Sequence, residues 1–335
     1  MAEWRPDVLG DEFEQLALEL GEDDEGPVSA TLVRSLPPEQ SWWDQVRGHR
    51  RPLEDVDVLY IHGWSDYFFQ KRLARFWTTR GARFFALDLR KYGRSLRDGQ
   101  TPGYIADLAT YDEDIGAALA AMGRGADGAA SSRRLVLFGH STGGLVLSLW
   151  ASRHPATVDA VILNSPWLEF QVASVRPLIA TVAELQARWA PREVAPQVDL
   201  GFYTRAQQEV ADPDDPVEVN PLWRPAQSMA VHAGWFHAIL TGHAAVAAGL
   251  TIDAPVCVLL SSRSARPTRW SDDLTRADSV LVVDDIARAA LKLGPSVTVE
   301  RIEGALHDVF LSRHEAREES YARLGRWVGG WSSAH

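Results

Sequence analysis

The stretch RLVLFGHSTGGLVLSLWASRHP, residues 134–155, decides the fold. An apolar run leads into the turn Gly-His-Ser-Thr-Gly, and a longer apolar segment follows the turn. A sharp turn from a strand to a helix forces its central residue, Ser141, into a strained backbone conformation, and Gly139 and Gly143 carry no side chains that would clash there. The pattern therefore predicts a strand, a tight turn that lifts the Ser141 hydroxyl above a sheet, and a helix.

Short apolar runs recur on both sides of this stretch, separated by amphipathic segments. Residues 67–81 carry apolar side chains at helical spacing, and residues 111–122 open with acidic residues, which suit the positive end of a helix. Continuous apolar strands that alternate with helices are typical of a parallel sheet covered on both faces. The predicted strands of this kind are 56–61, 83–89, 134–139, 158–164, 255–260 and 296–302.

Two further strands are expected near the N-terminus. Residues 13–20 alternate leucines with polar or small residues, and residues 28–36 form a second run after the turn-like GEDDEG. These two runs predict an antiparallel hairpin. The expected sheet therefore has eight strands, most of them parallel.

Residues 165–250 break the alternation of strands and helices. They contain several prolines, as in DPDDP (212–216), and a helix-like stretch at 176–189. We expect this segment to form a cap that is inserted into an α/β core. The core then consists of residues 1–164 and 251–335.

The composition excludes several classes of function. A net charge of −11 over 335 residues argues against nucleic acid as a partner, and no apolar run approaches the length of a membrane span. Cys257, the single cysteine, cannot form an internal disulfide, and we interpret it as a buried strand thiol. The sequence starts without the basic and apolar regions of a secretory signal, so no such signal is expected. A chain with one cysteine fits a reducing compartment, and a cytoplasmic location is therefore expected. The expected partner is a small molecule, and the sequence leaves open a homodimer.

A serine nucleophile needs a base, and His307 is the candidate among ten histidines. It directly follows the last predicted strand, where the base falls in the chain order serine, acid, histidine. His232, His237 and His243 do not have the spacing of a metal-binding pair on one helix face. We therefore expect neither a metal nor another cofactor.

The acid that orients the histidine should lie between the strands at 255–260 and 296–302. Asp284 and its neighbour Asp285 are explained as acids in the first turn of a helix, and Asp272 and Asp273 as loop residues. Asp278 is favoured, with Asp284 next, and the choice among the acids of this loop stays open.

An oxyanion hole is expected at HGW (62–64), directly after the strand at 56–61. The backbone N–H groups of Trp64 and Thr142 would then point at the negative charge that develops on the substrate. His140, Trp167 and Trp235 are the candidate substrate-binding residues. The alternative for the tryptophans is ordinary packing of the core and cap.

Five motifs run over most of the chain outside the expected cap: HGWSD (62–66), ALDLRKYGRS (86–95), GHSTGG (139–144), NSPW (164–167) and GALHD (304–308). Together they resemble the α/β-hydrolase superfamily, in particular its branch of monoglyceride-lipase-like and serine-aminopeptidase-like (S33) hydrolases. The resemblance implies the α/β-hydrolase fold with an inserted helical cap, and it implies Ser141 as nucleophile and His307 as base. In that branch the acid usually lies just after the penultimate strand, which supports Asp278, although residues 261–277 intervene here.

The function implied by the resemblance is hydrolysis of a carboxylic ester with an apolar acyl group, monoacylglycerol-like or small, through an acyl-enzyme on Ser141. One alternative is an aminopeptidase of the proline-iminopeptidase type, for which Glu169, Glu193 or Glu218 would have to hold a free amine. An acyltransferase or a C–C hydrolase would use the same residues. A catalytically inactive ligand-binding protein on this fold is the alternative from another class.

Overall fold

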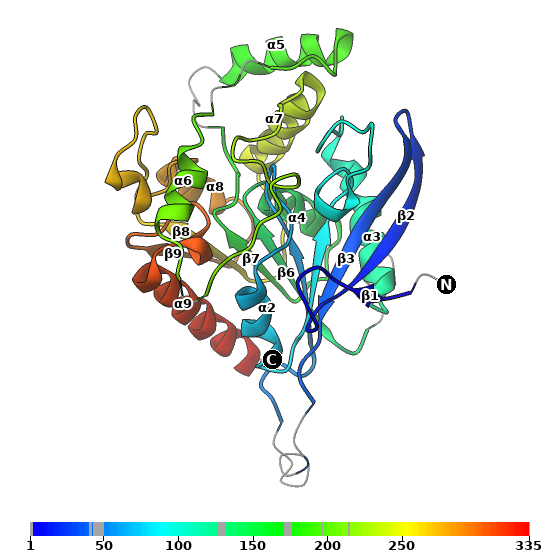
Figure 1. Ribbon diagram of the computed structural model, residues 1–335, viewed down its shortest axis with the longest axis vertical. Coiled ribbons are helices and arrows are strands. Elements are labelled where there is room, and N and C mark those ends of the chain that lie inside the picture. The colour runs from blue at the N-terminus through cyan, green and yellow to red at the C-terminus, as the bar shows by residue number, and fades with distance from the viewer. Residues whose placement is uncertain are drawn as a thin grey trace.

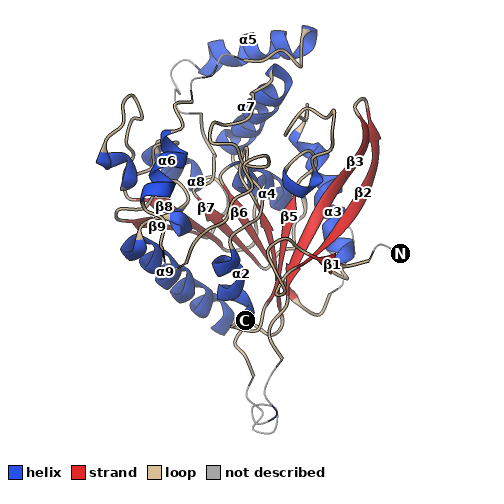
Figure 2. Cartoon of the chain, in the orientation of Figure 1, coloured by secondary structure: helices blue, strands red, loops and turns tan. Residues whose placement is uncertain are grey.

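A single mixed sheet lies at the centre of the molecule (Figures 1 and 2). The computed structural model describes residues 3–39, 42, 50–125, 131–170, 176–195, 197, 199–213 and 215–334. Within these residues the sheet has nine strands in the order β1-β2-β3-β5-β4-β6-β7-β8-β9. The strands are β1 (Arg5–Pro6), β2 (Glu14–Asp23), β3 (Gly26–Ser35), β4 (Val56–Ile61), β5 (Arg83–Asp88), β6 (Arg134–His140), β7 (Ala160–Asn164), β8 (Val256–Ser261) and β9 (Val297–Ile302).

The strand directions confirm the predicted organisation of the sheet. The six strands from β4 to β9 pair in parallel, while β2 and β3 form the antiparallel hairpin. The prediction of eight strands is wrong by one, because β1 adds two residues antiparallel to β2. Both residues of β1 are exposed, and two residues carry no periodicity that a sequence pattern could reveal.

Helices cover both faces of the sheet. They are α2 (Lys71–Thr78), α3 (Tyr111–Ala121), α4 (Thr142–Arg153), α5 (Arg176–Trp189), α6 (Phe202–Glu209), α7 (Ala233–Ala248), α8 (Val283–Ala290) and α9 (His314–Ser333), with short 3₁₀ helices η1 (Gly93–Ser95), η2 (Leu108–Thr110), η3 (Asp272–Thr275) and η4 (Val309–Leu311). The predicted helix at 67–81 is shorter than expected. It begins only at Lys71, because Gln70 has a non-helical backbone conformation, with φ −82° and ψ 78°. The Phe68 N–H, before the helix, donates to the Asp88 carboxylate at 2.8 Å.

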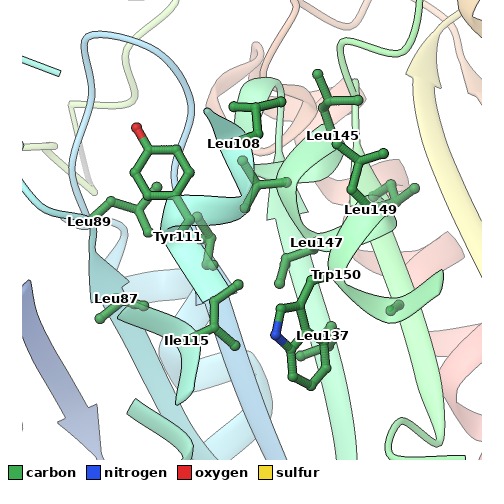
Figure 3. Close-up of a cluster of buried hydrophobic side chains, with 14 of the residues drawn as sticks. Leu87, Leu89, Leu108, Tyr111, Ile115, Leu137, Leu145, Leu147, Leu149 and Trp150 are labelled. Atoms are coloured by element: carbon green, nitrogen blue, oxygen red, sulfur yellow. The ribbon is translucent and has the colours of Figure 1, made fainter. Parts of the chain in front are cut away.

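Side chains of the strands alternate between two buried layers. In β4, Val58 and Tyr60 face α2 and α9, whereas Leu59 and Ile61 face the opposite layer. Figure 3 shows part of that opposite layer, where leucines of β5 and β6 meet side chains of α3 and α4. Since both layers are apolar, the parallel strands read as continuous apolar runs in the sequence.

The chain between β7 and β8 carries α5, α6 and α7, and α5 packs on α7 at the top of Figure 1. This is the segment 165–250 for which a cap is expected. It extends beyond the carboxyl ends of the parallel strands (Figure 2). The described part of the chain contains no helix that is long and apolar enough to cross a membrane.

An ionic cluster joins the tip of the β2–β3 hairpin to this segment. Lys91, which is almost fully buried, contacts Asp23 at 2.5 Å and Glu25 at 2.6 Å. Arg192, just after α5, pairs with Glu25 and lies 2.6 Å from Asp24. Burial by itself would raise the pKa of Glu25, but hydrogen bonds from Lys91 and Thr101 outweigh it and lower the pKa to about 2. The charged form of Glu25 therefore stabilises the folded chain.

We expect Glu25→Gln to remove a pH-dependent part of the stability. Because the folded pKa of Glu25 lies below its ordinary value of 4.5, its contribution is complete above that pH and is lost as the pH falls toward about 2. The variant should lose on the order of 2–3 kcal/mol of unfolding free energy near pH 7, and this difference should shrink below pH 4.5. Urea unfolding at a series of pH values measures it. Glu19→Gln, at an exposed pair with Arg97, is the control and should change stability little. A difference that does not depend on pH would contradict the assignment.

Candidate active site

The turn between β6 and α4 holds Ser141 in a strained conformation. Its φ of 51° and ψ of −116° lie outside the regions that residues other than glycine readily adopt. The turn is also tightly packed: a Cβ on Gly143 would lie 2.4 Å from the carbonyl oxygens of Ile61 and His62. A Cβ on Gly139 would lie 2.7 Å from backbone atoms of the first turn of α4. The two glycines therefore permit the turn that the sequence predicts, and the serine is placed at the start of α4.

His307 and Asp278 form a buried pair. The Nδ1 atom of His307 lies 2.9 Å from Oδ2 of Asp278, and both side chains are almost completely excluded from solvent. The other oxygen of Asp278 accepts the backbone N–H groups of Val280 and Leu281, at 2.7 and 2.8 Å. A carboxylate held in this way accepts the Nδ1 proton of the histidine and leaves Nε2 free to act as a base.

The loop after β8 brings Asp278 back to the end of that strand. Asp278 and Ser264 form an isolated parallel bridge, and the Asp278 N–H donates to the Arg263 carbonyl at 3.1 Å. The Ala265 N–H donates to the carbonyl of Asp278 at 2.8 Å. The residues between 264 and 278 thus form a loop whose two ends lie side by side. Asp278 therefore lies beside the first residues after β8, although many residues separate it from the strand in the sequence.

Three other acids between β8 and β9 lie at the surface. Asp284 is 65% exposed and pairs with Arg301, and Asp273 is 53% exposed and pairs with Arg263. Asp272 is exposed in η3. Among the acids considered from the sequence, Asp278 is the one that the structure places within hydrogen-bond distance of His307.

The peptide between Gly63 and Trp64 is oriented by His62. The ring Nε2 of His62 accepts the Leu89 N–H at 3.2 Å, so its Nδ1 carries the proton and donates to the Gly63 carbonyl at 2.8 Å. In a planar trans peptide the N–H points away from the carbonyl, and the N–H of Trp64 is therefore directed away from His62. Burial lowers the pKa of His62, which favours the neutral ring that this arrangement needs.

A cavity of about 710 Å³ opens over Ser141 and is lined by residues of the core and of the segment 165–250. Ser141, His307, Trp64 and Thr142 all line it, as do the expected substrate-binding residues His140 and Trp167. Apolar side chains cover part of the wall. These are Trp167, Phe170, Leu200, Phe202, Val280 and Leu281.

Trp235 has a different place from the one expected. It is buried in α7 and is not among the described residues that line the cavity. Its ring lies 3.8 Å from that of Trp64 and 6.1 Å from that of Trp167, between centroids. Trp235 therefore supports the two tryptophans of the wall from behind.

Polar residues that the sequence patterns did not single out complete the wall. Asp66 lies 2.8 Å from Nε of Arg224, a residue of the segment between α6 and α7. Burial raises the pKa of Asp66, although the charge of Arg224 opposes this shift. For Arg224, burial alone would lower the pKa, but the charge of Asp66 opposes this effect and the pKa is raised. Tyr203 of α6 lies edge-on to His307, with ring centroids 5.6 Å apart. Asp66 lies inside the motif HGWSD, but no pattern in the irregular sequence of residues 165–250 indicates Tyr203 or Arg224.

The described residues contain no cluster of three or more histidine, cysteine or acidic side chains with the geometry of a metal site. Two of the three histidines considered from the sequence have other contacts. His232 is hydrogen-bonded to the Arg192 carbonyl, and His243 to the Trp167 carbonyl. Cys257 is buried in β8, as interpreted from the sequence, and burial raises its thiol pKa, so that it stays protonated.

Comparisons with known proteins agree with this architecture. The model of a family described as serine aminopeptidase, S33, matches residues 55–263. A monoacylglycerol lipase of Mycolicibacterium smegmatis is 27% identical over 155 residues, which are 46% of this chain and 52% of that protein. The AB hydrolase superfamily protein YisY of Bacillus subtilis is 31% identical over 121 residues, 35% of this chain and 38% of that protein. The chain thus matches about half the length of the first of these relatives and less of the second.

Solved structures resemble the chain over nearly its whole length. A soluble variant of the monoglyceride lipase of Saccharomyces cerevisiae, in complex with a substrate analog, superimposes with a TM-score of 0.64 at 15% identity and covers 97% of this chain and 99% of its own. The monoacylglycerol lipase of Paleococcus ferrophilus gives 0.62 at 17% identity, with 90% and 98% covered. At these identities the likeness shows the fold, which is that of the α/β hydrolases.

We expect Gly143→Ala to disrupt the turn at Ser141. The added methyl group would collide with two backbone carbonyls of β4 and its following residue, which cannot move without displacing the strand. Such overpacking typically costs about 1–3 kcal/mol, and the turn should distort as well. Thermal unfolding and the rate of Ser141 modification by a reactive phosphonate measure the two effects. Gly329→Ala in α9 is the matched control, since its Cβ meets nothing within 4 Å. Equal behaviour of the two variants would contradict the packing argument.

Proposed function

The chain belongs to the S33 serine aminopeptidase family of α/β hydrolases, and we propose that it cleaves carboxylic esters through an acyl-enzyme on Ser141. The observation that carries the proposal is the hydrogen-bonded pair of His307 and Asp278, because His307 and the strained Ser141 line the same cavity. A serine hydroxyl is a weak nucleophile until a base takes its proton. A buried pair of this kind supplies that base.

The proposed mechanism has two halves. His307 Nε2 takes the Ser141 proton as the serine oxygen attacks the ester carbonyl, and the N–H groups of Trp64 and Thr142 stabilise the oxyanion. His307 then gives the proton to the leaving alcohol. In the second half His307 takes a proton from water, the resulting hydroxide attacks the acyl-enzyme, and the proton returns to Ser141 as the acid is released. Asp278 stabilises the imidazolium formed in both halves.

The contacts of the cavity support an ester more than a peptide with a free amino group. Two carboxylates line the described part of the cavity, and both are engaged. Asp66 is paired with Arg224, and Asp199 accepts the N–H groups of Gly201 and Ser228. Glu169, Glu193 and Glu218, the candidates considered for holding an amine, are not among the described lining residues. The apolar part of the wall suits an aliphatic or aromatic acyl group, as in a monoacylglycerol or a smaller ester.

The setting of the reaction is part of the proposal. We assign residues 165–250 the role of a cap, because Phe202 and other residues of this segment line the cavity. A cytoplasmic location is supported by the single, buried Cys257, which leaves the chain without disulfides. A homodimer is the candidate assembly, to be settled by sedimentation.

The serine-hydrolase assignment predicts covalent labelling by a fluorophosphonate probe. The wild-type protein should be labelled at Ser141, should hydrolyse p-nitrophenyl esters and should release the free acid. Ser141→Ala should not be labelled and should lose turnover by at least about 10³-fold, because the nucleophile is absent. Labelling is read on a gel and by peptide mass spectrometry.

Three outcomes of this experiment would contradict the proposal. An unlabelled wild-type protein would indicate a ligand-binding protein on this fold. Equal labelling of Ser141→Ala would place the nucleophile elsewhere. Turnover of aminoacyl-naphthylamides without turnover of esters would favour the aminopeptidase.

The choice of acid predicts a large difference between two conservative variants. Asp278→Asn should lower kcat by about 10⁴-fold, as the same change does in a serine protease, because an amide does not fix the histidine tautomer. Asp284→Asn, at an exposed carboxylate in the first turn of α8, is the control and should stay within about twofold of wild type. Steady-state kinetics on a p-nitrophenyl ester measure both. The assignment fails if the two variants lose activity to the same extent.

A further inference from the structure

Asp308, directly after His307, is a buried carboxylate that the proposed mechanism does not use. Its Oδ1 accepts the Asn164 side-chain N–H at 2.7 Å and the Phe310 backbone N–H at 3.0 Å. Its Oδ2 accepts the side-chain N–H of Gln70, just before α2, at 2.7 Å. Donors from three separate parts of the chain therefore converge on one carboxylate next to the proposed base.

Asn164, at the end of β7, holds the turn of the nucleophile as well as the loop of the base. Its backbone carbonyl accepts the N–H of Ser141 at 3.0 Å and lies 3.1 Å from Nδ1 of His140. Its side chain donates to Asp308 and accepts the Val309 N–H at 3.2 Å. A continuous path of hydrogen bonds thus runs from the Ser141 backbone through Asn164 to the residue after His307.

The cap contacts the same loop. The backbone N–H of Asp308 donates to the Tyr203 hydroxyl at 3.1 Å, and the Gln207 side chain donates to that hydroxyl at 2.8 Å. Tyr203 also lies edge-on to the His307 ring and lines the cavity. The loop that carries His307 is therefore fixed on one side by β7 and on the other by α6.

We propose that Asp308 is a positioning residue: paired with Asn164, it sets the distance and angle between the His307 imidazole and the Ser141 hydroxyl. This inference rests on the proposed function, since it concerns the same serine and histidine. Asp308 touches neither the serine nor the substrate in this role. It acts through the backbone of His307, and a displacement of about 1 Å in such a pair can lower the rate about 10²-fold.

The alternative is that Asp308 only stabilises the fold. Its side chain satisfies three buried donors, so its loss must cost stability in either case. The two roles differ in kinetics. A structural role lowers the amount of folded enzyme, whereas a positioning role lowers kcat per folded molecule and leaves KM nearly unchanged.

Three variants test the pairing. Asp308→Asn places an amide N–H against other N–H donors, and Asn164→Asp places a carboxylate against Asp308. Each should lower kcat 10- to 100-fold, with KM within about twofold of wild type. The double variant D308N/N164D restores an amide facing a carboxylate, and it should regain at least about tenfold in kcat over either single variant.

A remote carboxylate provides the matched control. Asp159, at the opposite end of β7, accepts the Leu135 N–H at 2.7 Å. Asp159→Asn also removes a carboxylate that accepts an N–H group, so it should lower the unfolding temperature. It should leave kcat per folded molecule unchanged. Active-site titration with the fluorophosphonate gives the concentration of folded enzyme for every variant.

The outcomes separate this inference from the proposed function. If the wild-type protein is neither labelled nor active, the proposed function fails. If the wild-type protein is active and folded Asp308→Asn keeps a kcat within twofold of it, the positioning role is overturned. The role is also overturned if the loss of activity equals the loss of titratable enzyme, or if the double variant shows no recovery.

Discussion

The strained backbone of Ser141 is the constraint on which the rest of the site depends. A residue other than glycine in this conformation costs on the order of 1–3 kcal/mol and persists only where its surroundings hold it. Here the surroundings hold both the N–H group and the carbonyl group of Ser141. The Ser141 N–H donates to Asn164 of β7, and the Ser141 carbonyl accepts the N–H groups of Gly144 and Trp167. Close packing of Gly143 against the end of β4 prevents the turn from relaxing.

The parallel sheet brings the remaining site residues to this turn, but only approximately. Parallel strands end at one edge, so the loops after β4, β8 and β9 all begin near Ser141. Loops alone do not fix a side chain to within an ångström. The fine positions come from polar contacts of buried residues: two backbone N–H groups hold Asp278, and the His62 ring orients the peptide before Trp64. The sheet thus provides proximity, and buried hydrogen bonds provide geometry.

Local patterns were sufficient to predict the parts of the structure that local physics determines. The turn at Ser141 needs glycines a fixed number of residues away, and buried strands need continuous apolar runs, so both are visible in the sequence. The sequence favoured Asp278 over the other acids but left the choice open, because the position of Asp278 depends on contacts with residues 263–265 that no spacing reveals. The two-residue strand β1 and the place of Trp235 behind the cavity wall were missed for the same reason. Each depends on a partner far away in the chain.

Polar contacts of the segment between β7 and β8 connect the cavity wall to two loops of the candidate active site. Arg224 pairs with Asp66 of the loop that carries Trp64, and the Met229 N–H donates to Ser65 of the same loop at 3.0 Å. Tyr203 contacts the loop that carries His307. Charged and hydrogen-bonded groups in a buried place are satisfied only in one arrangement, because losing a partner leaves the other uncompensated. A displacement of these residues would therefore disturb the two loops on which the proposed oxyanion hole and base depend. In this molecule the same contacts hold the walls of the cavity and the groups that the proposed mechanism would use.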